Sequence, residues 1–332
     1  MIRDEVPAGP GVYLFYDVHG NVIYIGKSVN LINRMLSYSR ERSTGNESRT
    51  RRMVYDIGEF AYYTTNSELV ALLLEDGLIK YHSPIFNKRQ KEYAEYRYLS
   101  LTKDEFPTLK ILADPTDLNT DGLFGPFRDR YFVEDLLWVV REHLNLRTCT
   151  DPVPFRNSMN YHLGYCVGPC RGMISHEEYA QVVAHVREFL EGDERLIVEK
   201  IHMEMGKASA RRDYERAATL RDRIRFCGKF CERQRFIHKF KTRNLVILDH
   251  GREVYRFSRG WLTEIDDAAD SVVKSLLGRP SKPTSNDPRF LLDRANIVYK
   301  WIRQQKDGCE YRFDNAPPGV VSRDVGLLKR QP

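Results

Sequence analysis

Apolar and polar positions alternate along two short runs near the beginning of the chain, residues 12–16 and 22–25. A period of two is typical of strands, and residues 17–21 between the runs have turn chemistry, so the pattern predicts a β-hairpin. If the loop runs from 17 to 20, the register places Tyr13 directly opposite Tyr24, with both phenols on one face. Two facing tyrosines also occur as plain cross-strand packing.

Further along, the apolar period changes from strand to helix and back several times. Residues 59–65 are predicted to form a third strand, and 244–248 and 253–257 two more. The predicted helices cover residues 28–36, 68–81, 132–144, 175–190, 194–209, 213–234, 266–277 and 289–305.

Helix 68–81 has apolar residues around nearly its whole circumference, which predicts that it is largely buried. Asp76 and Lys80 share its one polar stripe as an i, i+4 pair. Glu75 is not on that stripe, because at 100° per residue it falls between Ala71 and Ile79. A carboxylate among apolar neighbours is costly unless a cation or a metal ion stabilises it. The sequence is consistent with two partners for the Glu75 carboxylate, a buried arginine or a divalent metal ion.

Composition and charge narrow the class of protein. The 332 residues are 42% hydrophobic, as in a folded protein of two or three domains, and include six cysteines. No apolar run approaches the length of about 20 residues that a membrane span needs, and no apolar segment opens the chain. We therefore expect a cytoplasmic protein whose cysteines are reduced or metal-bound.

The net charge of +6 is concentrated in one stretch. Residues 200–243 contain 14 Lys and Arg against 5 Asp and Glu. Such a basic stretch indicates a polyanionic partner or, alternatively, the solvated face of a helix.

Five matched sites within about 80 residues resemble one nuclease family. They are Gly11-Val12-Tyr13, Tyr24-Ile25-Gly26-Lys27, Arg34, Glu75 in Ala-Leu-Leu-Leu-Glu, and Asn87 in Ile-Phe-Asn. Together they resemble the GIY-YIG nuclease domain, in the version found in the UvrC/Cho family of excision-repair endonucleases.

The resemblance implies an α+β fold whose first domain, 1–100, is a small α/β nuclease with an antiparallel three-stranded sheet. A mainly helical, cysteine-containing linker at 101–193 and a UVR helical hairpin at 194–236 would follow. A small C-terminal α/β region at 237–313 and a disordered tail at 314–332 would complete the chain. These last regions have no room for the second, RNase H-like nuclease half or its DNA-binding hairpins.

In this family the site hydrolyses a phosphodiester, and the implied catalytic set is Tyr13, Tyr24, Lys27, Arg34, Glu75 and Asn87. Glu75 would hold a single Mg²⁺ or Mn²⁺ ion, for which carboxylate oxygen is a suitable ligand. Arg34 would bridge phosphate oxygens and Lys27 would add positive charge. One tyrosine would orient or deprotonate the water, and which of the two does so is left open. Asn87 would position the water, the tyrosine or the phosphate.

Two more groups of residues are candidates for binding. The polar segment 39–52 reads as a mobile loop beside a phosphate backbone, and its arginines are expected to bind DNA: Arg40, Arg42, Arg49, Arg51 and Arg52. Cys149, Cys166 and Cys170 stand in a Gly/Pro-rich context typical of zinc or iron–sulfur sites. Ser158 stands where the family has its fourth cysteine, and His162 could complete a Cys3His set. The alternative is three thiols packed as small hydrophobes.

The stretch 213–224 resembles the UVR motif, whose hairpin docks on the helicase UvrB in the family. Its apolar seam would meet the partner through Tyr214, Ala217, Ala218, Leu220 and Ile224. The alternative is a helical linker packed on its own chain.

The sequence thus predicts a metal-dependent endonuclease that makes a single-strand incision in damaged DNA during nucleotide excision repair. It would be recruited by UvrB after UvrA has acted, and the missing second nuclease half points by analogy to the 3′ side of the lesion. The alternatives are a non-catalytic adaptor for UvrB or DNA, and a structure-specific nuclease independent of UvrA and UvrB.

Overall fold

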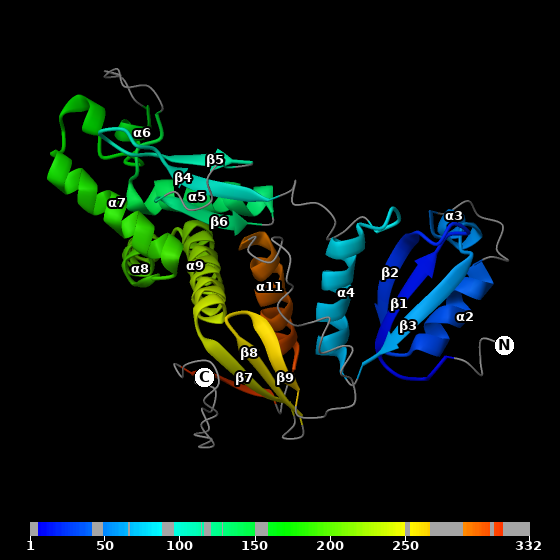
Figure 1. Ribbon diagram of the computed structural model, residues 1–332. Coiled ribbons are helices and arrows are strands. Elements are labelled where there is room, and N and C mark those ends of the chain that lie inside the picture. The colour runs from blue at the N-terminus through cyan, green and yellow to red at the C-terminus, as the bar shows by residue number, and fades with distance from the viewer. Residues whose placement is uncertain are drawn as a thin grey trace. The chain divides into compact units, whose positions relative to one another are not determined.

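The computed structural model describes residues 6–41, 49–65, 67–87, 96–113, 115, 121–127, 129–149, 159–249, 253–265, 288–305 and 309–314. They belong to two compact units (Figure 1). One unit combines Met1–Tyr93 with Lys239–Pro332, and the other is Ala94–His238.

The first unit begins with a three-stranded antiparallel sheet in the order β2-β1-β3, as predicted. Its strands are β1 Gly11–Tyr16, β2 Val22–Ser28 and β3 Glu59–Thr64. The predicted hairpin register is wrong, because Tyr13 pairs with Gly26 and Tyr24 pairs with Phe15.

The loop chemistry explains the shift. The Asp17 carboxylate accepts hydrogen bonds from the backbone N–H groups of His19 and Asn21, and the Asp17 N–H donates to the Asn21 carbonyl. These bonds include Asn21 in the loop and place a bulge after Phe15. Tyr13 and Tyr24 become diagonal neighbours on one face, with ring centroids 6.0 Å apart.

Three helices cover this sheet: α2 Leu31–Glu41, α3 Arg49–Tyr55 and α4 Glu68–His82. Helices α2 and α3 lie on one face and α4 on the other (Figure 1). Alternation along β1 accounts for both layers, because Tyr13 and Phe15 belong to the core under α2 and α3. Helix α4 starts at Ser67, whose hydroxyl accepts a hydrogen bond from the Val70 N–H, and ends at Ser83 in the left-handed conformation.

The C-terminal part of the same unit is a four-stranded antiparallel sheet in the order β10-β7-β8-β9, with one described helix, α11 Pro288–Gln304. The strands are β7 Asn244–Asp249, β8 Glu253–Ser258, β9 Trp261–Ile265 and β10 Cys309–Asp314. The predicted helix 266–277 lies outside the described residues.

The second unit opens with a three-stranded sheet, β5-β4-β6, in a region where the sequence predicts mainly helices. Its elements in chain order are β4 Arg97–Leu101, β5 Leu109–Leu112, β6 Leu123–Phe127, α5 Arg130–Leu144, α6 Met159–His162, η2 Pro169–Arg171, α7 His176–Glu191, α8 Arg195–Ala210 and α9 Tyr214–Thr242. Helix α7 has the predicted capping box, formed by Ser175 and Glu178.

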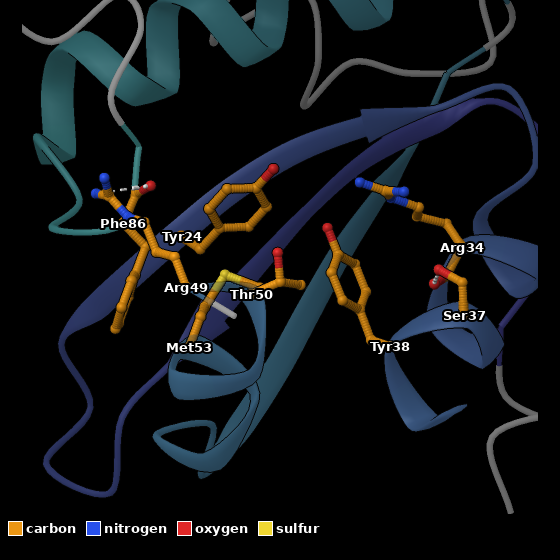
Figure 2. A pocket seen from close by; sticks show the side chains of 8 residues that line it. All are labelled: Tyr24, Arg34, Ser37, Tyr38, Arg49, Thr50, Met53 and Phe86. Carbon is orange, nitrogen blue, oxygen red and sulfur yellow. Dashed lines mark hydrogen bonds between the residues drawn. The ribbon is translucent and has the colours of Figure 1, made fainter. Parts of the chain in front are cut away.

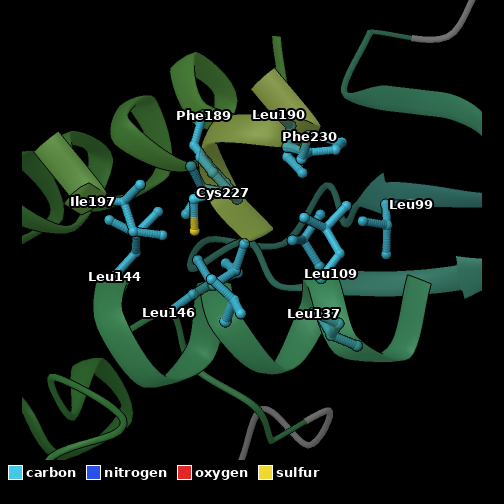
Figure 3. Close-up of a cluster of buried hydrophobic side chains, with 14 of the residues drawn as sticks. Leu99, Leu109, Leu137, Leu144, Leu146, Phe189, Leu190, Ile197, Cys227 and Phe230 are labelled. Carbon is cyan, nitrogen blue, oxygen red and sulfur yellow. The ribbon is translucent and has the colours of Figure 1, made fainter. Parts of the chain in front are cut away.

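One apolar core joins the sheet and helices of this unit (Figure 3). Leu99 and Leu109 reach it from the sheet, Leu137 and Leu144 from α5, and Phe230 from α9. No described helix in either unit is long and apolar enough to cross a membrane.

Candidate active site

The centre of the site is a hydrogen-bonded group of Tyr13, Arg34 and Tyr38. Arg34 Nε donates to Tyr13 Oη over 3.1 Å, and the Tyr13 and Tyr38 hydroxyls are 2.8 Å apart. The Arg34 guanidinium carbon also lies 4.7 Å from the Tyr38 ring centroid. Burial raises the pKa of Tyr13 far above its ordinary value and that of Tyr38 to about 12. Both phenols therefore keep their protons at neutral pH.

Gly26 allows this arrangement. The Tyr13 ring lies over its cross-strand partner Gly26, and a Cβ there would lie 2.6 Å from Tyr13 Cζ and 3.0 Å from Tyr24 Cε1. Any other residue would displace one of the two rings. The glycine of the Tyr24-Ile25-Gly26-Lys27 motif is thus needed for close approach of a side chain.

A pocket of about 250 Å³ opens beside this group. Figure 2 shows the Tyr24 and Tyr38 rings between the Arg34 guanidinium on one side and Arg49 with Phe86 on the other. Tyr24 is only partly buried, whereas Tyr13 is 1% exposed. Of the two motif tyrosines, Tyr24 is the one that a molecule in the pocket can meet.

The open edge of β2 is closed by Asn87 and Glu75. Asn87 uses both ends of its amide on Ile25, accepting from the N–H over 2.9 Å and donating to the carbonyl over 2.8 Å. Two residues further along the strand, the Lys27 N–H donates to Glu75 Oε1 over 3.0 Å. The amide thus holds the strand with one acceptor and one donor, and its role toward the water, the tyrosine or the phosphate stays a prediction.

Glu75 has the properties of a metal ligand. Burial raises the pKa of its carboxyl to about 7, while the Lys27 N–H and the Lys27 and Arg34 charges act in the opposite direction. No described residue hydrogen-bonds to Oε2, and no group of three described His, Cys, Asp or Glu residues could hold a metal ion. A single carboxylate still suits Mg²⁺ or Mn²⁺, because such ions keep several waters and bind substrate phosphate.

Lys27, the remaining predicted site residue, carries its charge at the N-terminal end of α4. Its Nζ lies 2.6 Å from Glu68 Oε1, and both side chains are partly exposed. An exposed pair of this kind contributes only about 0–1 kcal/mol, so an incoming phosphate can take the place of Glu68 at low cost.

Tyr38 and Ser37 are pocket residues that the sequence analysis missed. The signal for Tyr38 was its position four residues after Arg34, which places the two side chains on one helix face. Their stacking and the shared contact with Tyr13 make Tyr38 part of the site.

Comparison with known proteins matches three consecutive segments to one family. Residues 9–88 match the UvrC-like GIY-YIG domain, 96–189 the middle domain of the UvrC/Cho excinucleases, and 198–227 the UvrB/UvrC motif. The chain belongs to the UvrC/Cho family.

Relatives named UvrABC system protein C align over most of this chain. The protein from Moorella thermoacetica is 36% identical over 237 residues, which are 70% of this chain and 38% of the relative. The protein from Dictyoglomus thermophilum is 34% identical over 273 residues, which are 79% of this chain and 45% of the relative. The chain thus spans about two fifths of the length of the UvrC proteins that it matches.

Solved structures of the isolated N-terminal GIY-YIG endonuclease domain of Thermotoga maritima UvrC also match. The structure bound to magnesium, its catalytic divalent cation, is 34% identical, with a TM-score of 0.23. The match covers 26% of this chain and 94% of that domain.

The arginines expected to bind DNA do not all lie in a loop. Arg40 is exposed near the end of α2, and Arg42 lies outside the described residues. Arg49, Arg51 and Arg52 lie on α3, so the prediction of a loop through residue 52 is wrong. Arg49 reaches the pocket, with Nη2 donating to the Ile85 and Phe86 carbonyls over 3.3 and 3.4 Å.

The predicted Cys3His metal site of the UvrC middle domain is not assembled among the described residues. Cys149, Cys166 and Cys170 are free thiols, and no group of three described metal-ligating side chains includes them. Cys166 Sγ instead accepts a hydrogen bond from the Gly168 N–H, and burial raises the pKa of its thiol. His162 packs edge-on against Tyr161, and Ser158 lies outside the described residues.

The helical hairpin α8–α9 contains the UVR motif, but its apolar seam is divided. Leu220 is 1% exposed and belongs to the core of its own unit, with Ala217 and Ile224 packed against that core. Tyr214, by contrast, is 68% exposed, and Ala218 is partly exposed. The expectation that Leu220 meets a partner is therefore wrong, because the second unit already covers this side chain.

Proposed function

We propose that this chain is a divalent-metal-dependent DNA endonuclease that makes a single-strand incision 3′ of a lesion during nucleotide excision repair. The observation that carries the proposal is the convergence of Arg34, the three tyrosines and the buried Glu75 carboxylate on one hairpin. Membership of the UvrC/Cho family, and the solved UvrC endonuclease domains with a bound divalent cation, support it.

Three needs of phosphodiester hydrolysis are met by residues of this site: a ligand for the metal ion, cations for the phosphate and a group that orients the attacking water. Glu75 would hold the Mg²⁺ ion, and the ion would polarise the scissile phosphate when bound. Arg34 is a planar donor that can bridge two phosphate oxygens without losing its contact to Tyr13. Lys27 would neutralise a further phosphate charge after releasing Glu68.

The choice between the two motif tyrosines follows from their surroundings. Tyr13 is buried with a raised pKa and is hydrogen-bonded to Arg34 and Tyr38, so it orients Arg34. Tyr24 is the motif phenol at the pocket, and we assign it the role of orienting the water and, as a phenolate that has released its own proton to solvent, of receiving the proton of the water. The leaving 3′-oxygen takes a proton from solvent.

The test is incision of an end-labelled duplex that carries one bulky lesion, with UvrA, UvrB and Mg²⁺. We expect one nick 3′ of the lesion, lost in Arg34→Ala and Glu75→Gln and retained in Glu134→Gln, an exposed carboxylate-to-amide control on α5. Incision by both site variants at the wild-type rate would exclude this site as the nuclease.

Recruitment by UvrB is tested separately at the exposed part of the hairpin. Tyr214→Asp is expected to lower UvrB capture without unfolding the protein, because Tyr214 is 68% exposed. Unchanged capture by this variant, together with UvrB-independent incision, would support a nuclease that works without UvrA and UvrB.

A further inference from the structure

Four charged side chains meet where α4 packs on α11. Lys80 of α4 lies 2.7 Å from the Asp76 carboxylate and 2.8 Å from the carboxylate of Asp293 on α11. Arg294, the next residue on α11, contributes a second positive charge near Asp76. Asp76 is 0% exposed, and Asp293 and Arg294 are each 3% exposed. The polar stripe of α4 is thus an interface between the nuclease fold and the C-terminal region.

Aromatic rings hold the two cations of this network. Lys80 Nζ lies 4.7 Å from the Phe290 ring centroid, and Arg294 Cζ lies 4.8 Å from that of Trp261. Trp261 and Phe290 stack on each other with centroids 5.4 Å apart. Helix α11 therefore reaches α4 through a cation–π contact as well as an ion pair, and Trp261 of β9 packs on the α11 side chains Arg294 and Phe290.

The balance of charge makes the network sensitive to single changes. Among the described residues, two carboxylates face two cations here, and burial lowers the pKa of Arg294 to about 10. Removing one of these four charges would unbalance them at a buried place, whereas replacing an oppositely charged pair by apolar residues would keep the two signs equal.

The network holds the turn of α4 that contains Glu75. Asp76 directly follows Glu75, and Gly77 comes next. A Cβ at Gly77 would meet nothing within 4 Å, so this position adds no packing, and a glycine inside a helix weakens the helix. The contacts of Asp76 and Lys80 with α11 compensate for the weakening of the helix at Gly77.

We propose that Asp293 is a positioning residue for Glu75, acting through Lys80 to fix the turn of α4 that carries the carboxylate. The inference rests on the proposed function, in which Glu75 binds the metal ion. The C-terminal region is then part of the machinery that keeps the nuclease site in order.

The test uses the full chain and the variant Asp293→Asn, which keeps the side-chain volume and removes the charge. In metal-free protein, hydrogen exchange of the Lys27 amide reports directly on its bond to Glu75 Oε1. We expect this amide to exchange about tenfold faster in the variant. We also expect Mn²⁺ binding, followed by electron paramagnetic resonance, to weaken by about tenfold.

Two further variants separate positioning from general destabilisation. Phe257→Leu removes packing between β8 and Phe240 of α9 and does not touch this network, so it should lower the melting temperature while Lys27 exchange and Mn²⁺ affinity stay within about twofold of wild type. The double variant Lys80→Met, Asp293→Leu removes the residue through which Asp293 acts as well as the ion-pair partner of Asp76, so its Mn²⁺ affinity should be at least as weak as that of Asp293→Asn, and wild-type affinity there would also overturn the proposal. Equal losses in Phe257→Leu and Asp293→Asn would overturn the proposal.

The two proposals fail in different ways. Wild-type Mn²⁺ affinity in Glu75→Gln would overturn the metal-ligand assignment. Unchanged Lys27 amide exchange in Asp293→Asn would overturn the positioning role, whatever the result for Mn²⁺.

Discussion

Helix α4 carries two adjacent carboxylates that serve different regions of the molecule. Glu75 faces the edge of β2, and Asp76 faces α11. Burial raises the pKa of both carboxyl groups. Their partners differ, because Asp76 shares Lys80 with Asp293, whereas Glu75 has one backbone N–H and the Lys27 and Arg34 charges close by. The comparison shows that neither burial nor an unpaired oxygen identifies a functional carboxylate, since Asp76 Oδ1 is buried without a hydrogen-bond partner among the described residues; what distinguishes Glu75 is its place beside the cations of the pocket.

The largest effect expected from this comparison is on incision. Glu75→Gln should lower the incision rate on the order of a hundredfold to a thousandfold, because the variant cannot hold the charge that stabilises the reacting phosphate. Asp76→Asn should lower it by about tenfold or less, since it acts only through the position of the helix. Single-turnover incision at saturating Mg²⁺ measures both, and equal losses would contradict the distinction.

Part of this arrangement could be predicted from the sequence. The helical wheel separates Glu75 from the polar stripe, and the glycine and tyrosine spacing identifies the hairpin. The wheel could not show that Asp76 and Lys80 are buried, because their partner α11 lies more than 200 residues further along the chain. An i, i+4 ion pair is equally consistent with solvent and with an interface.

The next effect concerns stability in metal-free protein. The Glu75 pKa is about 7 in the folded state against an ordinary 4.5, so the folded state retains this proton to higher pH. The stabilisation that the protonated Glu75 carboxyl gives the folded state is complete below pH 4.5 and is lost as the pH rises through 7. Glu75→Gln should therefore be more stable than wild type by roughly 3 kcal/mol at pH 8 and by less than about 1 kcal/mol at pH 5.

Urea unfolding at the two pH values, with a chelator present, measures this difference. Glu134→Gln is the matched control, because its carboxylate lies on the surface of α5. A Glu75→Gln difference that does not change with pH would show that the carboxyl is not held protonated by its surroundings.

A smaller effect is expected at the β2 edge beside Glu75. Asn87→Ala removes both hydrogen bonds to Ile25 and should destabilise the protein by about 1–3 kcal/mol, because two buried backbone groups lose their partners. Asn87→Asp keeps the acceptor for the Ile25 N–H and should lose less. If Asn87→Ala removed incision with no loss of stability, the amide would act on the substrate directly.

Some features of the site could not be predicted, because the same sequence pattern is compatible with more than one loop length or side-chain direction. The hairpin register follows from the bonds that include Asn21 in the loop, and a four-residue loop was equally compatible with the alternation. Tyr38 could have been found from its spacing to Arg34, whereas the double use of the Asn87 amide depends on the fold of residues 84–87 against β2. Distant partners and side-chain directions are therefore what the structure adds.

The smallest effect is expected at Gly77, on the turn shared by the two carboxylates. Gly77→Ala should stabilise the protein by about 0.5–1 kcal/mol, because alanine favours the helix and its methyl group has space. The same change at Gly26 should destabilise it and lower incision, since the new Cβ would displace the Tyr13 ring. Thermal unfolding and incision of the two variants make a matched pair. If Gly77→Ala also lowered incision at wild-type stability or above, the turn would need the flexibility of glycine, and the fixed position that we ascribe to the α11 contacts would be wrong.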